Sequence, residues 1–99
     1  MLRNKRTDRS FPSRIVCLSY DVVEMLRSIG CADKIAGKPA GADVPGMENV
    51  RSIGGFGNPD IETITALKPD IVIGYSEVCA GDMARLIQRN IVTLTLQHT

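Results

Sequence analysis

The sequence has no tryptophan, a single histidine and no long apolar run. No stretch approaches the roughly 20 apolar residues of a membrane-spanning helix. The start of the sequence also lacks the apolar run that a secretory signal peptide contains. The one histidine, His98, leaves too few ligands for a zinc site. A serine-based catalytic triad is also disfavoured, because the nucleophile pattern G-x-S-x-G is absent. We therefore expect no metal site, no catalytic residues and no membrane-spanning segment.

Cysteine is also sparse, with Cys17, Cys31 and Cys79 far apart in the chain. An odd number of cysteines without a C-x-x-C pair argues against a disulfide framework or a redox motif. Free cysteines are usually buried as small apolar side chains. We predict that role here, with Cys79 the most exposed of the three.

The composition of the 99 residues, 43% hydrophobic and 23% charged, is typical of one small globular domain. The net charge of +1 gives no reason to expect a nucleic-acid partner. Basic residues gather only before position 15, where Arg3, Lys5, Arg6, Arg9 and Arg14 face a single Asp8. We predict that residues 1–13 form a disordered basic leader and that residues 14–99 form the folded domain.

Apolar runs alternate with helical patterns along the folded part. Strands are predicted at 14–18, 35–37, 70–74 and 91–96. One helix is predicted from a capping box of Asp21 and Glu24 up to Gly30, and another from an N-cap at Asn58, with Pro59 at its first position, up to Lys68. A third is predicted over 82–89, after a loop at 75–81. This order predicts an α/β fold of three layers around a mostly parallel sheet of about four strands.

In such a fold, ligands bind at the loops that follow the carboxyl ends of the strands. These loops are predicted at 19–21, 38–51 and 75–81, together with the glycine-rich stretch 54–58. Tyr20, Phe56 and Tyr75 all fall in them, and aromatic rings there favour a site for a bulky organic ligand. The 38–51 segment is longer than most connections, which also indicates a functional role.

The glycine-rich stretch does not fit a nucleotide site. Asp60 stands where the third glycine of G-x-G-x-x-G belongs, and no G-K-[ST] follows. Two interpretations remain open: a purely structural turn, or a loop shaped to let a ligand approach. A small α/β enzyme for a phosphorylated substrate is a minor third hypothesis.

Two segments resemble the substrate-binding proteins of ABC importers for cobalamin and iron–siderophores. The first is R-I-V-C-L-S-Y-D-V-V-E-M-L-R-S-I-G (14–30), which is similar to the opening strand and helix of that family. The second is I-G-G-F-G-N-P-D-I-E-T-I-T-A-L-K-P-D-I-V-I (53–73), with its glycine-aromatic loop and its L-K-P-D ending. The resemblance continues through 85–96 and covers about 80 residues.

The resemblance implies a non-enzymatic binding protein with two α/β lobes and a ligand in the cleft between them. This chain matches the first lobe only, so it is expected to be the amino-terminal half of the whole. The resemblance places on the cleft Ser19, Tyr20, Gly55, Phe56, Gly57, Tyr75 and Ser76. It also implies an acidic residue that contacts the membrane permease, for which Asp82 is the nearest match and Glu77 the second.

The leading hypothesis is therefore a lobe that binds cobalamin or a ferric siderophore, with no cofactor of its own. The alternative hypothesis is an interaction module or truncated gene product that pairs with a second lobe or with another copy of itself. The resemblance implies a periplasmic or extracellular location, whereas a chain without a signal peptide would stay in the cytoplasm.

Overall fold

The computed structural model describes residues 12–55 and 58–97, without the side chains of residues 76–79. Five strands form one parallel sheet in the order β3-β2-β1-β6-β7. They are β1 (Ile15–Cys17), β2 (Ile35–Lys38), β3 (Arg51–Ser52), β6 (Ile71–Tyr75) and β7 (Thr93–Leu96). The predicted α/β fold with its mostly parallel sheet is confirmed, and β3 is an additional short edge strand.

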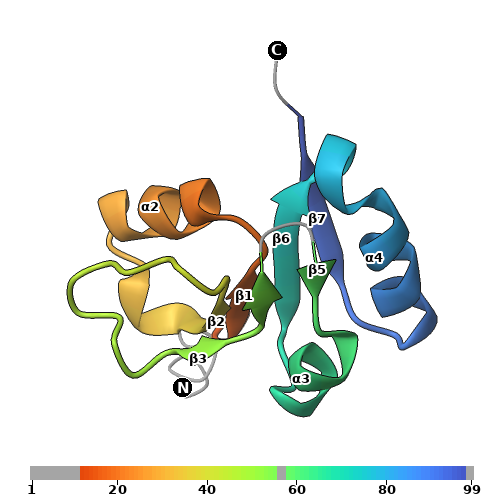
Figure 1. The fold of residues 1–99 in the computed structure, drawn as a ribbon, viewed down its shortest axis with the longest axis horizontal. Helices are drawn as coiled ribbons and strands as arrows, with labels where there is room; N and C mark the ends of the chain where they lie inside the picture. Colours follow the sequence, from red (N-terminus) through yellow and green to blue (C-terminus); the bar gives the residue numbers. More distant parts are fainter. Residues whose placement is uncertain (1–11, 56–57, 98–99) are drawn as a thin grey trace, which may run out of the picture.

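Helices cover both faces of this sheet (Figure 1). The helix α2 (Tyr20–Ser28) packs on one face and is followed by the 3-10 helix η1 (Ala32–Lys34). The helices α3 (Ile61–Ala66) and α4 (Ser76–Gln88) pack on the other face. Between β3 and α3, the short strands β4 (Gly54–Gly55) and β5 (Asn58–Pro59) pair antiparallel.

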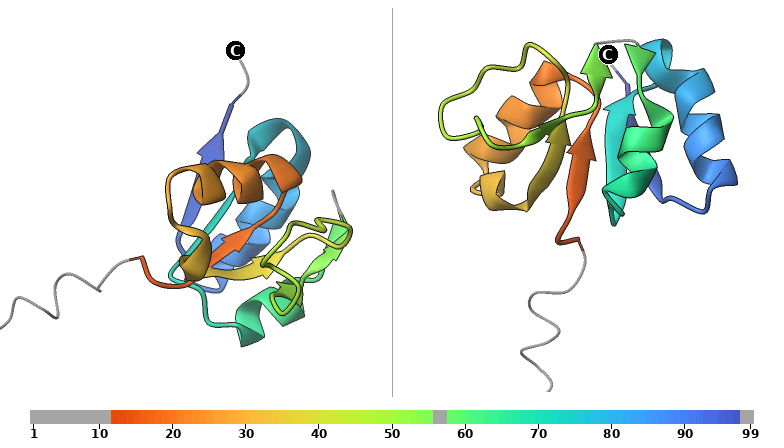
Figure 2. Two further views of the ribbon diagram at one scale, coloured as in Figure 1. Left: turned by 90° about the vertical axis from the view of Figure 1, so that its left-hand side faces the viewer. Right: turned by 60° about the horizontal axis from the view of Figure 1, so that its bottom comes forward.

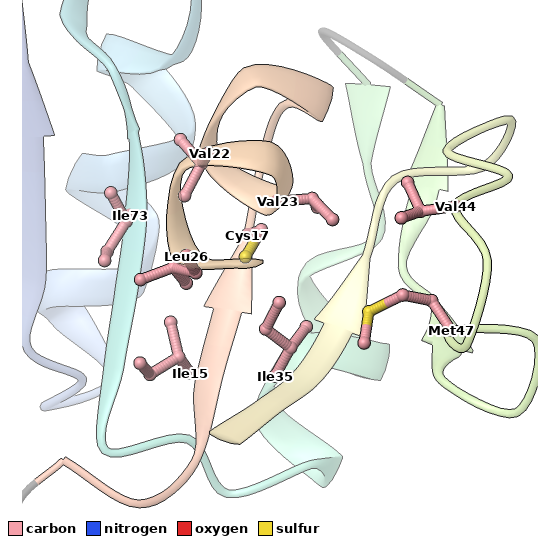
Figure 3. Close-up of a cluster of buried hydrophobic side chains, with 9 residues drawn as sticks. All are labelled: Ile15, Cys17, Val22, Val23, Leu26, Ile35, Val44, Met47 and Ile73. Carbon is pink, nitrogen blue, oxygen red and sulfur yellow. The ribbon is translucent and has the colours of Figure 1, made fainter. Parts of the chain in front are cut away.

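Alternate residues of the central strands divide the core into two clusters. One cluster lies under α2 and contains Ile15, Cys17, Val22, Val23, Leu26, Ile35, Val44, Met47 and Ile73 (Figure 3). The other lies under α3 and α4 and contains Val16, Leu18, Ile53, Ile64, Val72, Met83 and Leu86. Because β1 and β6 are buried on both faces, their sequences are almost wholly apolar.

The structure corrects the predicted start of α2. Ser19, not Asp21, is the N-cap, and its hydroxyl accepts a hydrogen bond from the Val22 amide at 3.4 Å. Glu24 does not close a capping box, because Val22 and not Glu24 is the third residue of the helix, and the Glu24 carboxylate pairs with Arg27 at 3.2 Å. At the other end, Gly30 has a φ of +82°, the left-handed conformation that its position after the helix predicts.

The start of α3 is corrected in the same way. Asp60 is the N-cap, and its carboxylate accepts hydrogen bonds from the amides of Glu62 at 3.0 Å and Thr63 at 3.3 Å. The predicted cap and first helical residue, Asn58 and Pro59, instead form β5. Pairing with β4 therefore decides the conformation of these two residues.

The predicted loop at 75–81 is wrong, because Tyr75 belongs to a strand and the other residues belong to a helix. β6 ends at Tyr75, and α4 begins at the next residue, Ser76, and runs without a break to Gln88. A single glycine inside a helix, here Gly81, costs only about 1 kcal/mol relative to alanine. Burial of Met83 and Leu86 in the second cluster stabilises the helix against that cost.

Asp70 joins the start of β1 to the start of β6. Its Oδ2 accepts hydrogen bonds from the Ser13 amide at 2.7 Å, the Ser13 hydroxyl at 2.9 Å and the Arg14 amide at 3.0 Å. These bonds favour the ionised carboxylate, with those from Ser13 contributing most, and they lower the pKa of Asp70. The aspartate of the L-K-P-D segment therefore has a structural role.

We expect Asp70→Asn to destabilise the fold at neutral pH and to lose that effect in acid. Because the pKa of Asp70 is lower in the folded state, its stabilisation is present above the ordinary value of 3.8 and is lost as the pH falls through the folded pKa. Urea denaturation at pH 7 and at stepwise lower pH measures the difference. Asp33→Asn, a change at an exposed carboxylate of η1, is the control. An equal effect of Asp70→Asn at every pH would contradict this account.

No helix among the described residues is long and apolar enough to cross a membrane.

Candidate functional site

The carboxyl ends of β1, β2 and β6 lie at one edge of the sheet because the three strands are parallel (Figure 2). β1 leads into Ser19 and Tyr20, β2 leads into the segment 39–50, and β6 ends at Tyr75. The two central strands stay paired up to this edge, where the Leu18 amide donates to the Ile73 carbonyl at 2.9 Å. The predicted cleft loops after β1 and β2 therefore begin at one edge.

A pocket of about 210 Å³, here called the rim pocket, opens at this edge. Its lining consists of Ser19, Tyr20, Asp21, Pro39, Ala40, Gly41 and Ala42. Among the described lining residues, only Tyr20 has a large side chain, and 50% of Tyr20 is exposed to solvent. An aromatic ring next to small residues forms a shallow wall against which a flat ligand can pack.

Ser19 and Tyr20 have different chemistry in this pocket. The Ser19 hydroxyl is buried and serves as the cap of α2, so its main role is structural. A hydrogen bond to Glu24, together with the negative charge of that carboxylate, raises the pKa of Tyr20. Tyr20 therefore presents a neutral phenol and an exposed ring at physiological pH.

The β4–β5 pair is tied to the rim pocket through Gly54. Its carbonyl accepts a hydrogen bond from the Ala40 amide at 2.8 Å, and Ala40 lines the pocket. A Cβ on Gly54 would lie 2.8 Å from the Asn58 carbonyl oxygen, whereas a Cβ on Gly55 would meet no atom within 4 Å. Gly54 thus serves the fold, and Gly55 leaves open space beside the rim.

The other predicted cleft residues are placed only in part. Tyr75 is half-buried at the end of β6, where it packs against the cluster under α2. Ser76 is the first residue of α4, and its side chain is not described. Phe56 and Gly57 lie outside the described residues. Their contact with a ligand stays a prediction, as it does for Ser19, Tyr20 and Gly55.

The acidic residues proposed for the permease contact both lie in α4. Glu77 is in the first turn, and Asp82 lies in the second turn rather than near the helix start as predicted. The Asp82 carboxylate pairs with Arg85 at 3.3 Å, and its side chain is only 16% exposed. The permease contact of Asp82, or of Glu77 as the second choice, therefore stays a prediction.

A second pocket is lined by residues of the 38–51 segment, which was predicted as a functional loop but none of whose residues was predicted as a site residue. This loop pocket has a volume of about 410 Å³ and is lined by Lys38, Asp43, Val44, Pro45, Met47 and Glu48. Lys38 is only 8% exposed, although it is charged. The unusual length of the loop and the lysine that ends an apolar strand were the available signals.

Two other kinds of site find no support in the described part of the chain. No group of three or more His, Cys, Asp or Glu side chains there is placed to hold a metal ion. A phosphate site at α3 is disfavoured because the Asp60 carboxylate already occupies the amides of the first turn.

A family model described as periplasmic binding protein matches residues 15–99. The chain is similar to the crystal structure of a periplasmic heme binding protein from Pseudomonas aeruginosa, with a TM-score of 0.79 and 25% identity over 88% of this chain and 32% of that one. It is also similar to the periplasmic vitamin B12 binding protein BtuF of Vibrio cholerae, with a TM-score of 0.75 and 23% identity over 85% of this chain and 34% of that one.

The iron uptake ABC transporter substrate-binding protein PiuA from Streptococcus pneumoniae is a third similar structure, with a TM-score of 0.69 and 24% identity over 89% of this chain and 32% of that one. The chain thus spans about a third of the length of the solved structures that it matches. A search of curated protein sequences gave no match.

Proposed function

The chain belongs to the periplasmic binding protein family, and on that premise we propose that it is a ligand-binding lobe of a substrate-binding protein for an ABC importer. The proposed ligand is a bulky organic metal complex: a cobalamin, a haem or a ferric siderophore. The lobe binds this ligand without making or breaking bonds. The similar structures named for heme, vitamin B12 and iron uptake support this class of ligand.

The observation that carries the proposal is the exposed ring of Tyr20 on the wall of the rim pocket. Pro39, Ala40 and Ala42 place only small apolar groups beside it, and Gly55 leaves open space next to the same turn. A large planar ligand gains most from such a surface, because ring packing buries area at little entropic cost.

The rim pocket is too small to enclose a large ligand, which supports a proposal that a second surface completes the site. Its volume of about 210 Å³ is below the roughly 300–1,000 Å³ of sites that enclose a drug-sized ligand. The pocket therefore holds one edge of a large ligand, and we propose that a second lobe covers the remainder. In the assembled protein, Glu77 or Asp82 would meet a basic residue of the permease.

We expect Tyr20→Ala to weaken binding of the preferred ligand about tenfold, since loss of one buried aromatic contact costs on the order of 1–2 kcal/mol. Spectroscopic titration with cyanocobalamin, haemin and a ferric hydroxamate siderophore measures this directly. Tyr20→Phe keeps the ring and should bind nearly as well as the unmodified chain. Ile29→Ala, at an exposed apolar residue near the end of α2, is the matched control. Equal ligand affinities of Tyr20→Ala and Ile29→Ala would show that Tyr20 does not contact the ligand.

A further inference from the structure

Lys38 is a buried cation that has no partner of opposite charge among the described residues. Its side chain takes part in no hydrogen bond or ion pair within residues 12–55 and 58–97, and only 8% of the residue is exposed. Its backbone is fixed, because its carbonyl accepts the Ile53 amide at 2.9 Å and it pairs in register with Ser52 of β3. A largely buried cation without a counter-charge is costly, and its place on the lining of the loop pocket points to a ligand.

An irregularity in β2 directs Lys38 into the loop pocket. Two consecutive residues of β1, Ile15 and Val16, pair with Ile35 and Gly37 of β2. Ala36 is therefore an extra residue in β2. A Cβ on Gly37 would contact side chains of Val16 and Ile53, which belong to the cluster under α3 and α4. The next residue, Lys38, therefore faces the α2 side, where the segment 39–50 covers it.

The loop pocket is bordered by a series of hydrogen-bonded turns. Successive hydrogen bonds join Ala42 to Pro39 at 3.2 Å, Met47 to Val44 at 2.9 Å and Val50 to Met47 at 3.0 Å. Val44 and Met47 are 3% and 5% exposed, and Figure 3 shows Met47 reaching from this segment toward β2. The pocket exists without a ligand because these side chains are anchored in the core.

The charges of the pocket select the chemistry of its ligand. Lys38 is buried, whereas Asp43 and Glu48 are exposed on the same lining. Neither carboxylate lies within ion-pair distance of the lysine among the described contacts. A simple anion would be attracted by Lys38 but repelled by the two carboxylates, and a simple cation would meet the opposite conflict. A ligand that carries one charge of each sign satisfies all three groups.

We propose that the loop pocket is a second binding site, for a small zwitterion with an apolar side chain, namely an apolar α-amino acid. Its carboxylate would pair with Lys38, its ammonium would face Asp43 and Glu48, and its side chain would lie against Val44, Pro45 and Met47. The site uses residues outside the rim pocket, so it does not depend on the proposed ligand of that pocket.

The test uses L-leucine and two analogues that each lack one charge: 4-methylpentanoate without the ammonium and 3-methylbutylamine without the carboxylate. Calorimetry on the full chain should show saturable binding of leucine, with at least tenfold weaker binding of each analogue. Amide resonances of Lys38, Val44 and Met47 should shift on titration. Absence of leucine binding up to 10 mM, or equal binding of 4-methylpentanoate, would overturn the proposal.

The variant Lys38→Met keeps the length of the side chain and removes the charge. It should abolish leucine binding while its urea denaturation midpoint stays equal to, or rises above, that of the unmodified chain, because no ion pair is lost. Lys38→Arg should retain binding, and Asp33→Asn, at an exposed residue that lines neither pocket, is a control that should not affect it. A lower denaturation midpoint for Lys38→Met would show instead that the lysine is a structural residue.

Discussion

Replacement of Gly54 by alanine should lower the free energy of unfolding by about 3 kcal/mol, the combined cost of an unfavourable backbone conformation and of an overpacked contact. Gly54 has a φ of +109°, which side-chain-bearing residues rarely adopt. Its added Cβ would lie 2.8 Å from the Asn58 carbonyl oxygen and 3.0 Å from the Asp60 nitrogen. These are backbone atoms, so no side-chain rotation relieves the contact. Urea denaturation followed by circular dichroism measures the loss.

The effect should extend from the β4–β5 pair to its neighbours. The Asp60 amide donates to the Ile53 carbonyl at 2.7 Å, and the Gly54 carbonyl accepts from Ala40 at 2.8 Å. Displacement of Gly54 therefore disturbs both the start of α3 and the wall of the rim pocket. For a domain whose total stability is on the order of 5–15 kcal/mol, this is a large fraction.

Gly55→Ala is the matched control for this prediction. The two glycines are adjacent in β4, but a Cβ on Gly55 meets no atom within 4 Å. A surface change of this kind should stay within about 0.5 kcal/mol of the unmodified stability. If both variants lost equal stability, the geometric distinction between the two glycines would be wrong.

The different surroundings of Gly54 and Gly55 also answer a question that the sequence left open. The glycine-rich stretch allowed either a structural turn or an approach for a ligand. The structure assigns the first role to Gly54, whose conformation and close contacts require glycine. Gly55 has the open space that the second role needs, and its contact with a ligand remains a proposal.

Local sequence patterns correctly predicted the elements whose conformation depends on their own residues rather than on distant contacts. The apolar runs at β1 and β6 are buried on both faces, so their composition alone identified them as parallel strands. Gly30 ends the segment after α2 in the left-handed conformation that such a position favours. Cys17 was predicted as a buried apolar residue, and it is fully buried under α2.

The errors arose where a distant contact overrides a local signal. Asn58 and Pro59 have the composition of a helix start, but pairing with Gly54 and Gly55 places them in β5. Gly81 suggested a loop, although burial of Met83 keeps that segment helical. The length of the 38–51 segment indicated a functional loop, but the place of Lys38 in the loop pocket could not be predicted, because its direction depends on an extra residue in the register between two strands.

The thiol of Cys17 should react at least about a thousandfold more slowly in the folded chain than in urea at pH 8. Burial raises the pKa of Cys17 from 9.0 to about 12, because the thiolate is desolvated in the core. At pH 8 this shift lowers the thiolate fraction from about one tenth to about one ten-thousandth, and the thiolate is the reactive form. The residue is also 0% exposed, so a reagent reaches it only when the fold opens.

The measurement needs a chain in which Cys17 is the only thiol, made by Cys31→Ser and Cys79→Ser. Its control, Cys17→Ser and Cys79→Ser, keeps only Cys31, which is partly exposed and should react readily without denaturant. Since labelling of Cys17 requires opening of the sheet, its rate should rise when Gly54→Ala is added to the first variant. Rapid labelling of Cys17 in the folded chain would mean that β1 is not the closed centre of the core, and the buried position of this cysteine would have to be rejected.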